Sequence, residues 1–283
     1  MKINPIYIST SSIKTKNVIE AVRQLSAITK NIELSGGCEY DESLLDKLIK
    51  IRRHEEINFL VHGYFPPPLK HFILNFADTD KNTRDFLEET MRFVGSLDTY
   101  YYSAHAGFKK NFISQRELLF ESADKKNFTV DDISYNLEWF QENFPNCKIA
   151  LENLYPNNSD KECCFMMHIN EIISVLERFP EVYFLLDLGH LKISAHIFDF
   201  NYVKAAELLF ENYSNRILGI HLSENNGYED DHFLIYSDSI QPMILKEYAD
   251  IIKNNKINIT IESRNSSIQE LSECLSLIIK AVS

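Results

Sequence analysis

The hydrophobic residues of this chain fall into two alternating patterns. In the first, apolar and aromatic runs such as 182–186 are too short and too rich in β-branched and aromatic residues for helices. Runs of this kind are typical of strands buried on both faces in a parallel sheet. They occur at 5–9, 32–35, 57–61, 99–104, 148–151, 182–186, 216–220 and 257–261.

The second pattern has helical periodicity and separates the apolar runs. Within 15–30, for example, Val18, Val22 and Leu25 form one apolar stripe. Thr129 is a good N-cap, and Pro180 stops a helix. The predicted helices cover 15–30, 41–53, 83–94, 129–144, 169–179, 200–213, 242–254 and 268–281, with Asp41 as an N-cap and Pro242 as a first helical residue.

This alternation predicts an α/β fold, a (β/α)8 TIM barrel. Strands that alternate with helices are parallel and joined by right-handed crossovers, and eight such units close into a barrel. The long segments 63–81, 106–126 and 222–241 all follow strands, so they meet at the C-terminal face. An open doubly wound sheet would usually carry a glycine-rich turn after its first strand, and 9–12 has none. The composition has no break, so we expect a single domain over 1–283.

Several strands also end in residues that bind metals. One acidic residue after a strand is commonly a loop residue or a helix cap. Here the placement repeats at six strand ends, which chance explains poorly. The residues are His62, His105, Glu152, Asp187, His221 and Glu262.

Four of these residues predict a metal site. Glu152, Asp187, His221 and Glu262 are mostly oxygen donors, which suit Mn²⁺, Mg²⁺, Co²⁺ or Zn²⁺ rather than a thiolate-loving ion. Four strands of one barrel can direct these side chains to one axial point. The alternative is a solvated polar rim without an ion.

Flanking residues extend the predicted site. His62 and His105 with Glu152 would hold one further ion, and His190, Asp230 and His232 would hold another, so we expect between one and three ions. Each histidine alone is more simply explained as a hydrogen-bonded loop residue. We expect the other histidines on the surface; they are His54, His71, His168 and His196.

Composition limits the class of protein. The formal net charge of −12 disfavours general binding to nucleic acid. Five cysteines without regular spacing argue against a disulfide framework, so a reduced cytoplasmic compartment is the default expectation. The N-terminus has no apolar signal region, and no apolar run approaches the roughly 20 residues of a membrane span.

Short motifs occupy these strand ends: Ile-Ala-Leu-Glu-Asn (149–153), Leu-Leu-Asp-Leu-Gly-His (185–190), Gly-Ile-His-Leu (219–222), Asp-Asp-His (230–232) and Ile-Glu-Ser (261–263). Earlier segments join them: Val-His (61–62), Leu-Asn-Phe-Ala-Asp-Thr-Asp (74–80) and Ala-His-Ala-Gly (104–107). Their order and spacing resemble the xylose isomerase-like superfamily, which includes sugar isomerases, epimerases and AP endonucleases of the endonuclease IV type. The resemblance covers nearly the whole chain.

The resemblance implies roles for individual residues. Glu152, Asp187, His221 and Glu262 match the central metal ligands of the epimerases, whose two glutamates also shuttle protons. His190 matches a residue that contacts oxygens of the substrate. In the endonuclease branch the same positions, with His62, His105, Asp230 and His232, match a trinuclear zinc cluster.

Three segments depart from the family patterns. The endonucleases carry an arginine and an aromatic residue after the second strand, whereas 36–42 reads Gly-Gly-Cys-Glu-Tyr-Asp-Glu and is acidic. Their lysine-bearing turn is replaced by Ser-Glu-Asn-Asn-Gly at 223–227. The glycine-rich stretch of the epimerases is replaced by Phe-Leu-Ile-Tyr-Ser-Asp at 233–238.

Three hypotheses about function follow. The first is a divalent-metal isomerase or epimerase of a sugar or sugar-like molecule, with or without phosphate, in which Glu152, Glu262 and His190 are catalytic. The second is an endonuclease IV-like phosphodiesterase, and the third is a metal-binding barrel without activity. We expect a small carbohydrate-like substrate and no binding to duplex DNA or to a membrane. The pattern is compatible with a homo-oligomer. Aromatic residues of the long segments would pack on substrate or a partner subunit; they are Tyr64, Phe65, Phe108 and Phe112.

Overall fold

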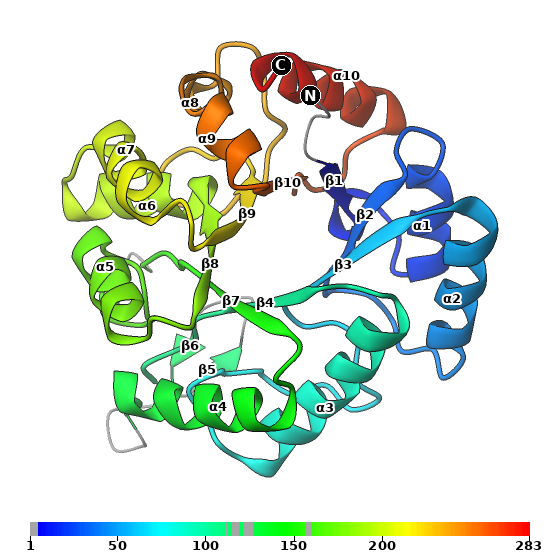
Figure 1. Ribbon diagram of the computed structural model, residues 1–283, viewed down its shortest axis with the longest axis horizontal. Coiled ribbons are helices and arrows are strands. Elements are labelled where there is room, and N and C mark those ends of the chain that lie inside the picture. Colours follow the sequence, from blue (N-terminus) through cyan, green and yellow to red (C-terminus); the bar gives the residue numbers. More distant parts are fainter. Residues whose placement is uncertain (1–4, 111, 115–118, 121–126, 157–159) are drawn as a thin grey trace.

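A closed ring of parallel strands forms the centre of the computed structural model, which describes residues 5–110, 112–114, 119–120, 127–156 and 160–283 (Figure 1). Around the ring the order is β1-β10-β9-β8-β7-β4-β3-β2, and all barrel pairs are parallel. The (β/α)8 TIM barrel prediction is therefore confirmed. The strands are β1 (Ile6–Ser9), β2 (Asn31–Leu34), β3 (Asn58–His62), β4 (Tyr101–His105), β7 (Lys148–Glu152), β8 (Tyr183–Asp187), β9 (Ile217–Leu222) and β10 (Asn258–Ile261).

The strands bury side chains on both faces, as the unbroken apolar runs predict. One face packs against the surrounding helices and forms the large core. Because neighbouring side chains of a strand point to opposite faces, the other face fills the barrel interior. Its buried cluster combines residues of five different strands: Tyr7, Leu60, Tyr101, Ala150 and Leu185. This interior cluster packs beneath the side chains at the C-terminal ends of the strands.

Helices surround the barrel near the positions that the periodicity predicts (Figure 1). Thr129 caps α4 as expected, and its N–H donates to the Asp132 carboxylate at 2.7 Å. Helix α5 ends two residues before Pro180. The helices that match predictions are α1 (Val18–Leu25), α2 (Leu44–Glu55), α3 (Lys81–Ser96), α4 (Val130–Asn143), α5 (Ile169–Arg178), α7 (Tyr202–Tyr213), α8 (Ile240–Glu247) and α10 (Ile268–Ala281).

Several local predictions were wrong. Asp41 is not the N-cap of α2; Ser43 holds that position, and Asp41 accepts hydrogen bonds from the Ser43 backbone and hydroxyl. Pro242 is the third residue of α8, and this helix ends at Glu247, so that α9 (Ala249–Asn254) follows as a separate element. A small antiparallel pair, β5 (Phe112–Ser114) and β6 (Leu119–Phe120), lies in the long segment after β4.

The most consequential addition is α6 (Leu188–Phe198), which starts directly after β8. Most of its residues are buried, so its sequence shows apolar residues on nearly every side and no stripe. Asp187 ends the strand and caps this helix, and its carboxylate accepts from the His190 N–H at 2.7 Å. The strand-to-helix junction therefore places Asp187 and His190 together.

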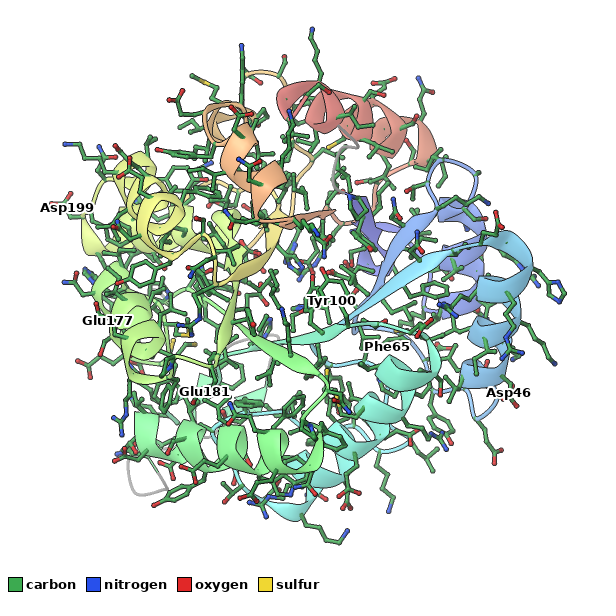
Figure 2. The ribbon with its side chains drawn as sticks, in the orientation of Figure 1. Asp46, Phe65, Tyr100, Glu177, Glu181 and Asp199 are labelled. Carbon is green, nitrogen blue, oxygen red and sulfur yellow. The ribbon has the colours of Figure 1, made fainter. Side chains whose placement is uncertain are left out.

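Charged residues lie on the outside of the helical layer. Figure 2 shows Asp46, Glu177 and Asp199 at the periphery. The predicted surface position holds for His54, His71 and His196, but His168 is half-buried and caps α5 through Nδ1, which accepts from the Asn170 N–H at 3.1 Å. In the described part of the chain, no helix is long and apolar enough to cross a membrane.

Candidate metal centre

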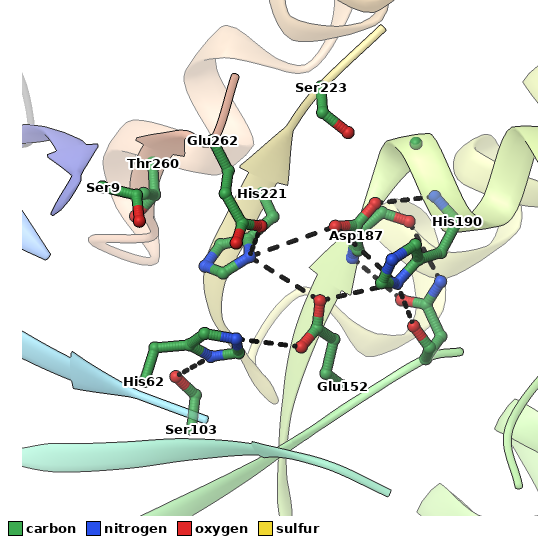
Figure 3. A network of polar contacts seen from close by, with 12 residues as sticks. Ser9, His62, Ser103, Glu152, Asp187, His190, His221, Ser223, Thr260 and Glu262 are labelled. Carbon is green, nitrogen blue, oxygen red and sulfur yellow. Dashed lines mark hydrogen bonds and ion pairs between the residues drawn. The ribbon is translucent and has the colours of Figure 1, made fainter. Parts of the chain in front are cut away.

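The ends of four neighbouring strands bring the four candidate metal ligands together (Figure 3). Glu152 and Asp187 are the last residues of β7 and β8, His221 lies in β9 opposite Asp187, and Glu262 directly follows β10. One ligand atom from each residue lies within 4.8 Å of the others. The sequence-based prediction that these four residues converge is therefore met by the geometry.

His221 lies at the middle of this group. Its Nδ1 is 3.0 Å from Oε2 of Glu262, 3.6 Å from Oε1 of Glu152 and 4.0 Å from Oδ2 of Asp187. Glu152, Asp187 and His221 are almost completely shielded from solvent, and Glu262 opens toward the cleft above. One nitrogen and three carboxylates thus face a common point.

The polar atoms at this point lack hydrogen-bond partners among the described residues. Both carboxylate oxygens of Glu152, Oδ2 of Asp187 and Nδ1 of His221 are buried without one. Burying charged groups unsatisfied costs several kcal/mol. A divalent cation would satisfy all of these atoms at once, and oxygen-rich donors are the set that hard and borderline ions prefer. The residues present therefore fit such an ion.

The pKa shifts of Glu152 and Asp187 fit a cation site, because a nearby positive charge would favour their ionised forms. Burial raises the pKa of Glu152 well above its usual range and also raises the pKa of Asp187. Burial works in the same direction on Glu262, but the adjacent His221 outweighs it and holds the pKa of Glu262 far below its usual range. The pKa of His221 is raised despite burial because Glu33 and Glu262 flank the ring.

A second group of ligands shares Glu152 with the first. Oε2 of Glu152 lies 3.4 Å from Nε2 of His62 and 3.5 Å from Nε2 of His105, whereas its Oε1 faces His221 and His190. Burial lowers the pKa of His62 to about 3, so this imidazole is neutral, as a metal ligand must be. The Glu152 carboxylate therefore has the placement of a bridge between two ion positions.

The remaining predicted trio is arranged around Asp230. Its Oδ2 lies 2.6 Å from Nε2 of His232, and its Oδ1 lies 3.7 Å from Nε2 of His190. Burial would raise the pKa of Asp230, but these two imidazoles hold it well below its usual range. Within the described residues this trio does not form a compact ligand group like the other two. Asp230 pairs closely with His232 only, and its Oδ1 is buried without a hydrogen-bond partner among the described residues.

Hydrogen bonds at Nδ1 orient three of the imidazoles. Nδ1 of His62 lies 3.0 Å from Oγ of Ser103. Nδ1 of His190 lies 2.9 Å from the carbonyl of Asn153, and Nδ1 of His232 lies 2.7 Å from the carbonyl of Glu262. Carbonyls only accept, so the last two rings donate from Nδ1 and turn Nε2 toward Asp230.

Two residues of the centre were missed from the sequence. Glu33, in β2, is fully buried and 3.1 Å from Nε2 of His221; its signal is an acidic residue within a buried strand. The Asn153 side chain accepts from the Asp187 N–H at 2.8 Å and donates to the Asp187 carbonyl at 3.0 Å. The sequence feature that could have pointed to Asn153 is its position directly after the candidate ligand Glu152.

A cleft of about 1080 Å³ leads down to the cluster, with His62, Glu152 and Glu262 on its lining. This is the upper end of the size range of small-molecule sites. All three long segments contribute to the cleft, as predicted, through residues that include Tyr64, Phe108 and His232.

The aromatic predictions divide into three outcomes. Tyr64 and Phe108 line the cleft, together with Tyr155, whose ring centroid is 4.8 Å from that of His190. Phe65 is fully buried in the core, so it faces neither a substrate nor a partner. The side chain of Phe112 lies outside the described part of the structure.

Basic residues lie on one side of the cleft wall, and an acidic residue lies beside the cleft after β2. Lys14 and Lys16, which follow β1, and Arg264, which follows β10, bring positive charge to one wall, since β1 and β10 are neighbours. The segment after β2 contributes Cys38 and Tyr40, beside the exposed acid Glu39. The wall near β1 therefore favours a small anionic group.

Comparisons of the sequence with known proteins gave one match and no family. No family model matches the chain. It is 24% identical over 268 residues to the uncharacterized protein MJ1614 of Methanocaldococcus jannaschii, and the match covers 92% of this chain and 91% of the relative. This likeness gives no activity.

Solved structures share the whole barrel. A D-tagatose 3-epimerase-like protein aligns with a TM-score of 0.67 at 19% identity, covering 98% of this chain and 99% of the other. D-psicose 3-epimerase of Clostridium cellulolyticum H10 gives 0.68 at 13% identity, with 98% and 99% covered. An AP endonuclease of family 2 from Brucella melitensis gives 0.64 at 13%, with 98% of each chain covered. The fold is thus the TIM barrel that these epimerase and epimerase-like structures and the endonuclease share.

Proposed function

We propose that this xylose isomerase-like barrel is a divalent-metal-dependent isomerase or epimerase of a small sugar that carries an anionic group. The main support is the pair of glutamates at the base of the cleft. Glu152 and Glu262 face the same ligand group, yet burial raises the pKa of Glu152 and His221 lowers that of Glu262. Two carboxyl groups with opposite shifts are suited to the acid and base roles of one reaction.

The reaction needs a carbon-bound proton to be removed and returned. A divalent ion held by Glu152, Asp187, His221 and Glu262 would bind the adjacent carbonyl and hydroxyl oxygens of the sugar and acidify the hydrogen between them. Glu262, which is favoured in its charged form, accepts that proton. Glu152, from a different strand, returns a proton to the other side. His190 keeps Nε2 toward the cleft, where it meets a substrate oxygen.

The cleft supports the substrate class. Lys14, Lys16 and Arg264 offer positive charge on the wall near β1, where the phosphate of a sugar phosphate would bind. Tyr155 and Phe108 provide apolar faces on which the carbon skeleton packs. The net charge of −12 does not oppose a small ligand that enters along this wall.

The test is proton exchange between solvent and sugars. The protein, loaded with Mn²⁺, Co²⁺, Mg²⁺ or Zn²⁺, is incubated in D₂O with ketoses and ketose phosphates, and deuterium at carbon is measured by mass spectrometry. We expect exchange with at least one member and stronger exchange with phosphorylated members. Glu138→Gln, an exposed change on α4, serves as the matched control and should exchange like the parent. Absence of exchange with all metals and both sugar classes contradicts the proposal.

A second candidate function is phosphodiester cleavage by a metal cluster. It is favoured by one observation: Glu152 presents Oε1 to one ligand group and Oε2 to another, so two ions could share it. Paired ions clamp the attacking and leaving oxygens of such a reaction. The exposed acid Glu39, beside the cleft, opposes a DNA backbone.

Metal content and DNA incision separate the two functions. One tightly bound ion per chain and no incision of abasic-site DNA favour the isomerase. Two or three ions together with incision of abasic-site DNA would reverse the order of the candidates. The same preparation serves for both measurements, so loss of folding cannot explain a difference between them.

A further inference from the structure

We infer that Glu33 is a positioning residue of the metal site, which holds the ring proton of His221 on Nε2 and so presents Nδ1 to the ion. The inference rests on the metal site of the proposed function but not on the identity of its substrate. Glu33 lies in β2, on the opposite side of the ring from the cluster, and is not in any of the compact ligand groups of the described residues.

The two nitrogens of His221 have different surroundings. Nδ1 faces Glu262 at 3.0 Å and Glu152 at 3.6 Å, whereas Nε2 faces Oε2 of Glu33 at 3.1 Å. An ionised carboxylate only accepts hydrogen bonds, so the Glu33 contact places the proton on Nε2. A neutral imidazole then keeps its lone pair on Nδ1, and a lone pair is what a metal requires.

A second donor fixes the carboxylate of Glu33. Oγ1 of Thr260 donates to the same Oε2 at 3.0 Å. Thr260 and His221 are register partners on β10 and β9, so both point into the barrel in the same layer. The oxygen is thus committed to two donors from adjacent strands, which leaves Glu33 unable to serve as a ligand through that atom.

Packing alone does not explain why a carboxylate, rather than a neutral side chain, is buried at position 33. His62, His190 and His232 are oriented by neutral groups, namely a hydroxyl and two backbone carbonyls. His221 differs from these three because a carboxylate, that of Glu33, orients its ring. Oε1 of Glu33 is buried and has no hydrogen-bond partner among the described residues.

A neutral side chain would meet the same two donors without burying a charge. Carboxylates that receive the second N–H of a ligating histidine fix its tautomer and raise its basicity toward the ion. This effect on the ligand is the gain that offsets the cost of burial.

The experiment uses full-length protein with ¹⁵N-labelled histidine, and Zn²⁺ as a diamagnetic probe. In the parent, His221 should carry a hydrogen on Nε2 both without and with Zn²⁺, and Nδ1 should show the shift of a bound nitrogen only with Zn²⁺. Glu33→Met should weaken Zn²⁺ binding by about 10–100-fold, the usual effect of losing such a partner. Glu33→Gln, whose amide oxygen can still accept from Nε2, should restore part of the affinity.

Thr260→Val is the control, since it removes the other donor to the same oxygen while leaving the ring contact intact. It should bind Zn²⁺ nearly as well as the parent. The inference is overturned if the Zn²⁺-bound parent ring carries its hydrogen on Nδ1, if folded Glu33→Met binds Zn²⁺ like the parent, or if Thr260→Val loses as much affinity.

Failure of Glu33→Met to fold would leave the decision to the ring signals of the parent and to Glu33→Gln. Intact Zn²⁺ binding with no turnover of any sugar would overturn the proposed function alone. A parent that binds none of Mn²⁺, Co²⁺, Mg²⁺ and Zn²⁺ would overturn both.

Discussion

Individual residues at the cluster divide into those that would bind the ion and those that hold the binders. Asp187 is buried and receives hydrogen bonds from both the His190 N–H and the side chain of Asn153 that brackets its backbone. Asp187 is thereby held in place before any ion binds. Such preorganisation reduces the loss of side-chain freedom on binding.

The glutamates should be separable from the fold by conservative substitution. Glu262→Gln and Glu152→Gln keep size and one oxygen donor, so both variants should fold. Removal of a general base or acid typically lowers the rate by about 10²–10⁴-fold. The measurement is deuterium exchange into the best sugar, alongside metal content. A variant that exchanges as fast as the parent with full metal loading would remove that glutamate from the proton shuttle.

Asn153 should matter to stability as well as to the site. Asn153→Ala leaves the buried N–H and carbonyl of Asp187 without their partner, and each such loss costs about 1–3 kcal/mol. We expect a lower free energy of unfolding in urea and weaker metal binding. Asn212→Ala is the control, because Asn212 is exposed on α7 and donates to the Leu208 carbonyl. Equal effects from both variants would contradict the role of Asn153.

At the scale of elements, the junction of β8 and α6 carries the tightest packing of the site. A Cβ placed on Gly189 would lie 2.5 Å from Oγ of Ser223, 3.0 Å from the Ser223 carbonyl and 3.2 Å from Oδ1 of Asp187. No side chain fits there while the backbone stays in place. The glycine thus allows the first turn of α6 to lie against the segment after β9.

A pair of glycine substitutions tests this junction. Gly189→Ala should displace the start of α6, lower the unfolding free energy and weaken metal binding. Gly95→Ala, near the end of α3, meets no atom within 4 Å and should be neutral or stabilising by up to about 1 kcal/mol. Urea denaturation and Zn²⁺ titration measure both. Gly189→Ala with parent-like metal affinity would show that the junction tolerates movement.

Sequence alone predicts the barrel strands and the four central ligands because a buried parallel strand is an unbroken apolar run with an abrupt polar end. It does not predict α6, since a helix buried on most sides has no stripe, and Asp187 looked like the end of a strand only. Glu33 was also missed, because one charge in a four-residue strand resembles ordinary alternation. Both signals depend on contacts with residues far away in the chain.

For the whole molecule, an ion should contribute directly to stability. The buried carboxylates repel one another without it, and an ion that binds only the folded chain at about 100 times its dissociation constant adds about 2.7 kcal/mol. A chelator should therefore lower the melting temperature by several degrees. Asp187→Asn should reduce this response, since it removes a ligand charge. A melting temperature that is the same with and without chelator, after confirmed metal loading, would contradict the metal site.

The contact between Glu33 and Thr260 joins residues that are 227 positions apart, and the contact between Glu33 and His221 spans 188. The ring closes only when β1, from the beginning of the chain, meets β10 from its end. Contacts over such distances form late in folding because a long loop must first be closed. The contacts of Glu33 with His221 and Thr260 are therefore complete only when folding is complete. Zn²⁺ should slow unfolding in stopped-flow experiments and leave the refolding rate unchanged, and a Zn²⁺-dependent acceleration of refolding would mean that half the barrel already gathers its ligands.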